Sequence, residues 1–291
     1  MKDSISKTHI KKFKKDFKSH ASLKISRNAL TRSDINNIAM NWDGYRLIDH
    51  TFSDTISTEM TKVTNQKASG RCWGFAGLNL MRLDLAQKYN LKEFEFSQNY
   101  FMFCDKLEKS NYFLENILKT LEESYDSRIM MYLLDSPIED GGQWDMFVNI
   151  IEKYGVMPKS VMPESYQSSS SRMMNRFITR KLREFASTLR KMYIKGSSIS
   201  TLKKTKESML STIYSMLCVC LGNPPDNFDW QVRDKKKKFI RFSNLTPKDF
   251  YKKHVNINLR DNLYNSLYFL FDIGALIKQT LSLKFILTCF L

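Results

Sequence analysis

The spacing of apolar residues along the chain predicts a mainly helical protein. Over residues 73–89 apolar side chains fall on most sides of a helix, which predicts a buried central helix. A second helix is expected to begin after Ser97, because serine is a favoured N-cap residue, and a third is expected over 111–123. A fourth helix is predicted over 143–153, where Gly155 follows as a stop signal.

A longer amphipathic pattern follows the serine run at 168–171, which we interpret as a short linker. Between residues 174 and 193 apolar positions recur every three or four residues, so a long helix is predicted there. Its opposite face is rich in arginine and is expected to be solvated. Gly196 interrupts the pattern, and a further helix is expected over 202–221.

Polar and apolar residues alternate after Gly222-Asn-Pro-Pro. The stretch "FDWQVRDKKKKFIRF" alternates on both sides of a basic run, which predicts a β-hairpin with a solvated, charged tip. Thr246 and Pro247 then have the pattern of a capped helix start. The final segment, 263–291, is apolar but interrupted by charges. Its uninterrupted part is too short to cross a bilayer, so no membrane partner is expected.

The distribution of charged residues predicts a basic arm at the N-terminus. Lys and Arg number 46 against 30 Asp and Glu, a formal net charge of +16, and much of the surplus lies in residues 1–32. Such a surplus attracts nucleic acid or an anionic membrane surface non-specifically. We interpret the arm as a solvated helix with Ile10, Phe13 and Phe17 on one face. A non-catalytic basic protein, or decayed paralogue, with nucleic-acid affinity is the alternative function.

The cysteines indicate a reducing setting. There are five, an odd number without the spacing of a disulfide framework, and Cys218-Val-Cys220 has no neighbouring ligands that would complete a zinc site. No metal or cofactor site is predicted. The first residues are too charged for a signal peptide, so a cytoplasmic location is expected.

Cys72 is the strongest candidate for chemistry. It follows a Ser-Gly-Arg turn at the predicted start of a helix, where unpaired N–H groups stabilise a thiolate. Gln66 lies six residues earlier, and its amide can donate a hydrogen bond to an oxyanion beside the sulfur. The N–H of Cys72 would be the second donor. The opposing interpretation makes Cys72 a small core residue.

Several strings resemble one family of enzymes. "VTNQKASGRCWGFAGLNLMR", "FEFSQNYFMFCDKLEKSNYFLENI", "DGGQWDMFVNIIEKYGVMPKSVMPES" and "LTPKDFYKKHV" resemble the bleomycin hydrolase and aminopeptidase C branch of the papain-like cysteine peptidases. The resemblance covers roughly residues 10–257 and implies an α+β, papain-like fold. The expected segments are a basic arm (1–32), a helical domain with a helical insertion (33–222), the start of a β-rich domain (223–257) and an atypical apolar tail (258–291).

The resemblance also implies an activity and its residues. The family's members are thiol proteases that remove N-terminal residues from peptides, and Cys72 and Gln66 would be the catalytic residues here. Trp73 would pack over the thiol, and Asp140, Gly141 and Gly142 would line the substrate groove. Two glycines before a helix also fit an ordinary tight turn. The family further implies a homo-hexamer.

No residue of the sequence matches the general base that such a thiol requires. His9, His20, His50 and His254 match no catalytic segment of the family, nor does any Asn segment, and we interpret each histidine as a surface or packing residue. The resemblance ends near residue 258, so we expect a C-terminal truncation and negligible peptidase activity of this polypeptide alone.

Overall fold

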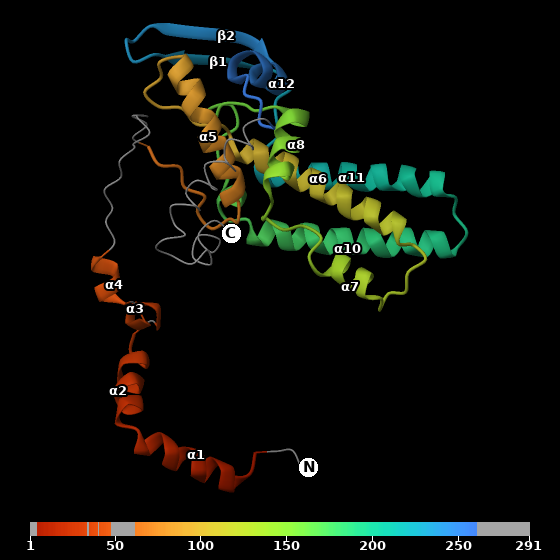
Figure 1. Cartoon of the computed structure of the whole chain (residues 1–291). Helices are drawn as coiled ribbons and strands as arrows, with labels where there is room; N and C mark the ends of the chain where they lie inside the picture. Colours follow the sequence, from red (N-terminus) through yellow and green to blue (C-terminus); the bar gives the residue numbers. More distant parts are fainter. Residues whose placement is uncertain (1–4, 34, 40, 48–61, 261–291) are drawn as a thin grey trace. The chain divides into compact units, whose positions relative to one another are not determined.

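The computed structural model describes residues 5–33, 35–39, 41–47 and 62–260 (Figure 1). The chain divides into two compact units, Met1–Ser57 and Thr58–Leu291. The predicted apolar tail lies outside the described residues from position 261 onward. The four segment boundaries expected from the sequence therefore stay predictions.

The first unit is helical, as the pattern of its basic arm predicts. Its described helices are α1 (Lys7–Ser19), α2 (Ala21–Leu30), α3 (Ile35–Ala39) and α4 (Trp42–Arg46). Helix α1 begins at a capping box, in which the Ser6 side chain accepts from the N–H of His9 and the His9 ring accepts from the N–H of Ser6.

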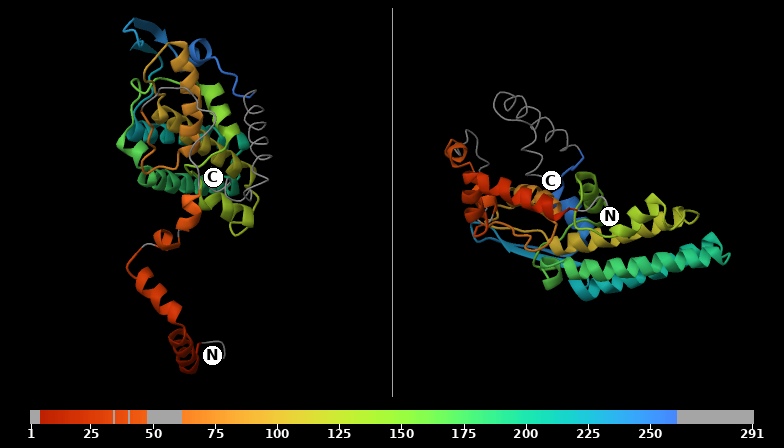
Figure 2. Two further views of the ribbon diagram at one scale, coloured as in Figure 1. Left: turned by 60° about the vertical axis from the view of Figure 1, so that its left-hand side comes forward. Right: turned by 90° about the horizontal axis from the view of Figure 1, so that it is seen from below.

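The helices of the second unit carry most of the core. Helices α6 (Gln98–Lys119), α10 (Arg172–Ile194) and α11 (Ile199–Leu221) pack along one another (Figures 1 and 2). The long amphipathic pattern is confirmed, because one face of α10 is buried in this contact. Helix α5 (Cys72–Lys88) packs on α6 and on α8 (Trp144–Tyr154). The close approach to α8 requires Gly77, since an added Cβ would lie 2.5 Å from the Phe147 ring.

Two details of the helical prediction are wrong. Helix α6 is continuous, whereas a separate helix was expected over 111–123, because no glycine or proline interrupts its pattern after Ser97. The serine run is not simply a linker, since it includes the end of the short helix α9 (Tyr166–Ser169). Helix α7 (Arg128–Asp135) was not predicted, although Ser127 caps it.

The hairpin predicted after Gly222 is present. Strands β1 (Phe228–Arg233) and β2 (Phe239–Leu245) pair antiparallel as a two-stranded sheet, with Trp230 opposite Phe242. Thr246 caps α12 (Pro247–Asp249), and the chain continues directly into a π-helical turn, η1 (Phe250–Val255). The α+β expectation is therefore confirmed, with helix predominating in the described residues. Within them, no helix has the length and apolar character needed to span a bilayer.

Candidate functional site

Cys72 lies where the sequence predicts it, as the first residue of α5. Its side chain is exposed, while Gly74, Phe75 and Leu78 of the same helix are buried. No side chain caps the helix at Arg71, and its first turn contains no acidic residue. The first N–H groups of a helix lack partners within it, so the thiol stands at the positive end of the helix dipole.

Gln66 and Cys72 line the same open pocket. The pocket has a volume of about 610 Å³ and is completed by Val63, Thr64, Asn65, Phe75, Ala76 and Asn79. The backbone carbonyl of Gln66 accepts a hydrogen bond from Ser69. No described residue hydrogen-bonds its side-chain amide, so that amide can act as a donor to a group bound beside the sulfur.

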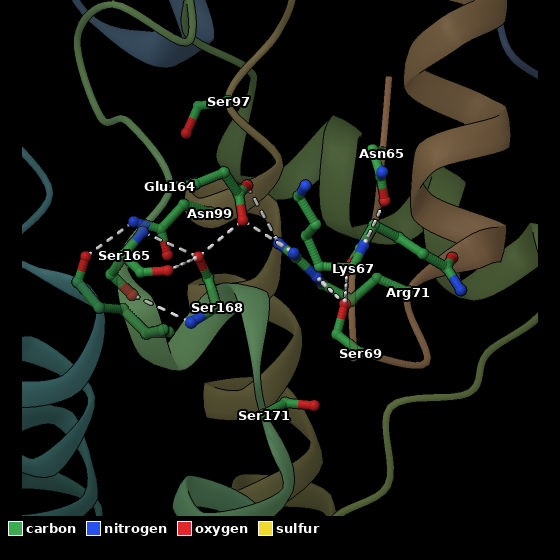
Figure 3. Close-up of polar contacts among 12 residues, drawn as sticks. Asn65, Lys67, Ser69, Arg71, Ser97, Asn99, Glu164, Ser165, Ser168 and Ser171 are labelled. Atoms are coloured by element: carbon green, nitrogen blue, oxygen red, sulfur yellow. Dashed lines mark hydrogen bonds and ion pairs between the residues drawn. The ribbon is translucent and has the colours of Figure 1, made fainter. Parts of the chain in front are cut away.

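A buried ion pair holds the residues before Cys72, which we call the nucleophile turn (residues 66–71). Arg71 is only 2% exposed, and its guanidinium donates to both carboxylate oxygens of Glu164 at 3.2 and 2.8 Å. Its Nε donates to Ser69 Oγ at 2.8 Å, and Ser69 Oγ donates to the carbonyl of Gln66 at 2.7 Å. One guanidinium thus connects the backbone of Gln66, through Ser69, to Glu164. Figure 3 shows Arg71 between Ser69 and Glu164.

The serine run supports the same turn from the other side. The N–H of Ala68 donates to the carbonyl of Ser169 at 3.0 Å, in an isolated parallel bridge. The buried Ser168 Oγ donates to Glu164 Oε2 at 2.7 Å, as Figure 3 shows. The serines expected to form a short linker therefore help to fix the nucleophile turn.

Asp140 lies at the centre of a second polar cluster, the Asp140 cluster. Its carboxylate accepts four hydrogen bonds or ion-pair contacts, from Gly70 N (2.9 Å), Ser171 Oγ (2.5 Å), Lys106 Nζ (2.7 Å) and Asn175 Nδ2 (2.7 Å). Burial alone would raise the pKa of Asp140. The Lys106 ammonium and these hydrogen bonds outweigh burial and hold the pKa well below its usual range.

The other groove residues adjoin this cluster. The indole N–H of Trp73 donates to the carbonyl of Asp140 at 2.6 Å. Gly142 packs on the same indole, since an added Cβ would lie 2.5 Å from Trp73 Cζ2. Gly141 is exposed, and nothing lies within 4 Å of where its Cβ would be. The structure thus brings Trp73, Asp140 and Gly142 together beside the nucleophile turn, and substrate binding by these residues stays a prediction.

His254 does not serve Cys72. Its Nδ1 lies 2.7 Å from the hydroxyl of Tyr89, at the far end of α5, and it packs among Trp230, Phe242 and Phe250. Helix α5 has 17 residues, which corresponds to about 25 Å between its ends. Burial, with the Lys88 and Lys253 charges nearby, lowers the pKa of His254.

No other described histidine supplies a base in the second unit. His9 belongs to the cap of α1 in the first unit, His20 separates α1 from α2, and His50 lies outside the described residues. In residues 62–260, therefore, no imidazole is placed to take the thiol proton. The part of the chain that the structure describes also contains no group of His, Cys, Asp and Glu side chains suited to a metal ion.

Sequence reasoning missed the residues that support the site. Arg71, Lys106 and Glu164 were not singled out, because a charged residue in a sequence is usually solvent-exposed. The only available signal was the position of Arg71 directly before Cys72 and ahead of a buried helix, where its charge would require a distant acidic partner.

Comparison with known proteins identifies close relatives. The Peptidase C1-like family matches residues 4–266. Bleomycin hydrolase from Oryctolagus cuniculus is 41% identical over 259 residues, covering 84% of this chain and 94% of that sequence. Aminopeptidase C from Listeria monocytogenes is 49% identical over 214 residues, covering 74% of this chain and 47% of the relative.

A solved structure agrees with these matches. The crystal structure of PepW from Lactobacillus rhamnosis HN001 superposes with a TM-score of 0.82 at 44% identity, over 90% of this chain and 58% of that one. The mouse, rat and human bleomycin hydrolases are likewise matched over 57% of their length. The chain thus spans little more than half the length of most of these relatives.

Proposed function

Because this chain belongs to the Peptidase C1-like family, in its bleomycin hydrolase and aminopeptidase C branch, we propose that it is a cysteine-type aminopeptidase. Its α+β fold is papain-like. The observation that supports the activity most directly is the exposed Cys72 thiol at the start of α5, in the same pocket as the amide of Gln66.

The proposed reaction begins at the thiolate. The sulfur of Cys72 attacks the carbonyl carbon of the N-terminal residue of a peptide, and the carbonyl electron pair moves onto oxygen. The side-chain amide of Gln66 and the N–H of Cys72 donate hydrogen bonds to that oxyanion. When the intermediate collapses, the C–N bond breaks, the thioester forms, and the departing amine must take up a proton.

The need to protonate the departing amine distinguishes peptide cleavage from acylation by an activated ester. The described residues place no imidazole beside Cys72, so an amide leaving group receives no proton from them. An activated ester has a leaving group that departs without one. We therefore expect this polypeptide to be acylated by activated esters and to turn over amides negligibly.

An aminoacyl p-nitrophenyl ester and an aminoacyl-coumarin amide together test the proposal. We expect the ester to release about one equivalent of p-nitrophenolate in a burst, with an aminoacyl adduct on Cys72 in the intact and peptide-mapped mass. The coumarin amide is expected to remain uncleaved. If no adduct forms on Cys72, the assignment of Cys72 as the nucleophile is wrong. If coumarin is released and the release depends on Cys72, the conclusion that the described residues supply no general base is wrong.

Gln66 is expected to accelerate acylation by donating a hydrogen bond to the oxyanion. We expect Gln66→Ala to slow acylation by the ester by about 10²-fold, because one preorganised donor to the tetrahedral oxyanion is lost. Alkylation by iodoacetamide forms no oxyanion, so its rate should not change. Gln87→Ala, an exposed glutamine near the other end of α5, is the matched control. Equal acylation rates for the two variants would exclude the role.

Peptide substrates follow from this proposal, and the cytoplasmic location stays a prediction from the cysteines and the charged N-terminus. Homologues named bleomycin hydrolase and aminopeptidase C support the substrate class. The homo-hexamer implied by the family and weak nucleic-acid binding through the basic arm stay predictions from the sequence.

A further inference from the structure

We propose that Asp140 is a positioning residue that fixes the nucleophile turn against the Gly141-Gly142 segment and thereby sets the reactivity of Cys72 toward peptide-like substrates. The inference rests on the proposed function. It concerns a residue that acts through the backbone around Cys72 and that does not itself take part in bond making.

Asp140 contacts the chain on both sides of Cys72. Its carboxylate accepts from the N–H of Gly70, two residues before the sulfur, and its carbonyl accepts from the indole of Trp73, one residue after it. The approach to Gly70 is close, since a Cβ added there would lie 2.8 Å from Asp140 Cβ. Asp140 therefore fixes the distance between the nucleophile turn and its own segment.

The carboxylate is itself held by elements on its far side. Lys106 of α6, which is 0% exposed, contacts Oδ1 at 2.7 Å, and Asn175 of α10 donates to the same oxygen. The buried Ser171, at the start of α10, donates to Oδ2. Lys109, one turn along from Lys106, donates to the carbonyl of Gly141 at 2.6 Å. Side chains of two helices thus hold Asp140 and the glycine after it.

This arrangement affects the reaction through geometry. The N–H of Cys72 is the second oxyanion donor, and it follows Gly70 by two residues. A displacement of about 1 Å between donor and reacting group costs on the order of 10²-fold in rate. Loss of the Gly70–Asp140 hydrogen bond removes the restraint nearest to that donor, while the Arg71–Glu164 pair still holds the rest of the turn. A small alkylating reagent reacts with the sulfur without forming an oxyanion, so its rate would not depend on the position of the N–H donor.

The charge and the hydrogen bond can be separated by mutation. Removing the Asp140 charge alone would leave the buried Lys106 ammonium with only the more distant Asp105 carboxylate, at 3.9 Å, as an ionic partner and would destabilise the fold. Lys106→Met combined with either Asp140→Asn or Asp140→Ala removes both charges, so no ammonium is left without its carboxylate. Asparagine keeps an oxygen that accepts from Gly70 N–H, whereas alanine does not. In both variants Asp105 keeps its 2.9 Å ion pair with Lys109.

The test compares two reagents on these matched double variants. For each protein, the rate of acylation by the aminoacyl p-nitrophenyl ester is divided by the rate of alkylation by iodoacetamide. Both rates are measured well below the melting temperature of that protein. We expect the ratio for the alanine double variant to be at least about ten-fold below that for the asparagine one, with iodoacetamide rates within about two-fold. Asn175→Ala, which loosens the carboxylate, should lower the ratio in the same direction.

The outcomes distinguish this inference from the proposed function. Equal ratios in the two double variants and in Asn175→Ala overturn the positioning role while leaving Cys72 as the nucleophile. A wild-type protein that forms no ester adduct on Cys72 overturns the proposed function and the inference with it. A fall in both rates together indicates a general loss of structure and also overturns the positioning role.

Discussion

Cys72→Ala is expected to abolish acylation of the protein by an aminoacyl p-nitrophenyl ester. The thiolate is the attacking group, and no hydroxyl or second thiol lines the described pocket beyond Thr64. We expect a loss on the order of 10³-fold or more in the burst rate, together with loss of the mass adduct. The side chain is exposed, so the fold should be unaffected.

Cys218→Ala is the matched control for this prediction. Cys218 is half-buried in α11, and Cys104 is buried in α6, where burial raises the pKa of its thiol. Burial also raises the pKa of Cys220. Cys104 and Cys220 therefore favour the unreactive protonated form, and Cys218 is only partly accessible, so Cys218→Ala should acylate like the wild type. An adduct that survives Cys72→Ala and maps to another cysteine would refute the assignment.

Glu164→Ala is expected to destabilise the second unit strongly. The substitution leaves the buried Arg71 guanidinium without its carboxylate, because Ser69 is then its one remaining hydrogen-bond partner among the described residues. Breaking a buried pair in this way costs about 3–5 kcal/mol. Urea denaturation followed by circular dichroism measures the change. Acylation of Cys72 should also slow, because Arg71 directly precedes it.

Glu184→Ala tests whether the effect depends on burial. Glu184 pairs with Lys181 on the exposed side of α10, with side-chain exposures of 61% and 34%. An exposed pair contributes at most about 1 kcal/mol, so this variant should unfold close to the wild-type midpoint. Similar shifts for the two glutamate variants would show that Arg71 is not held by Glu164 in the way the structure indicates.

The candidate active site is therefore stabilised by polar contacts across several elements. The cysteines that the structure describes are free, so no disulfide fixes the nucleophile turn among those residues. Its position instead depends on the Arg71–Glu164 pair, the Ala68–Ser169 hydrogen bond and the Asp140 cluster. Because Arg71 and Lys106 are buried, loss of a carboxylate that faces either of them leaves a buried charge with fewer partners and is costly.

Much of the local structure could be predicted from the sequence. The caps at Ser97 and Thr246, the hairpin after Gly222 and the central helix at Cys72 are all as expected. These features depend on neighbouring residues in the chain, through capping hydrogen bonds and the spacing of apolar side chains. The predicted division of α6 into two helices was wrong, because no glycine or proline interrupts the chain between Gln98 and Lys119.

By itself the sequence determined the identity of the candidate nucleophile, its position at a helix start and the amide of Gln66 six residues before it. The tertiary structure alone decided what holds them. Arg71 meets Glu164 across 93 residues, and Gly70 meets Asp140 across 70. It also placed His254 at the wrong end of α5 to act as a base. Such pairings depend on how distant segments pack. The periodic pattern of a segment shows which of its own faces is buried, but not which distant residue that face meets.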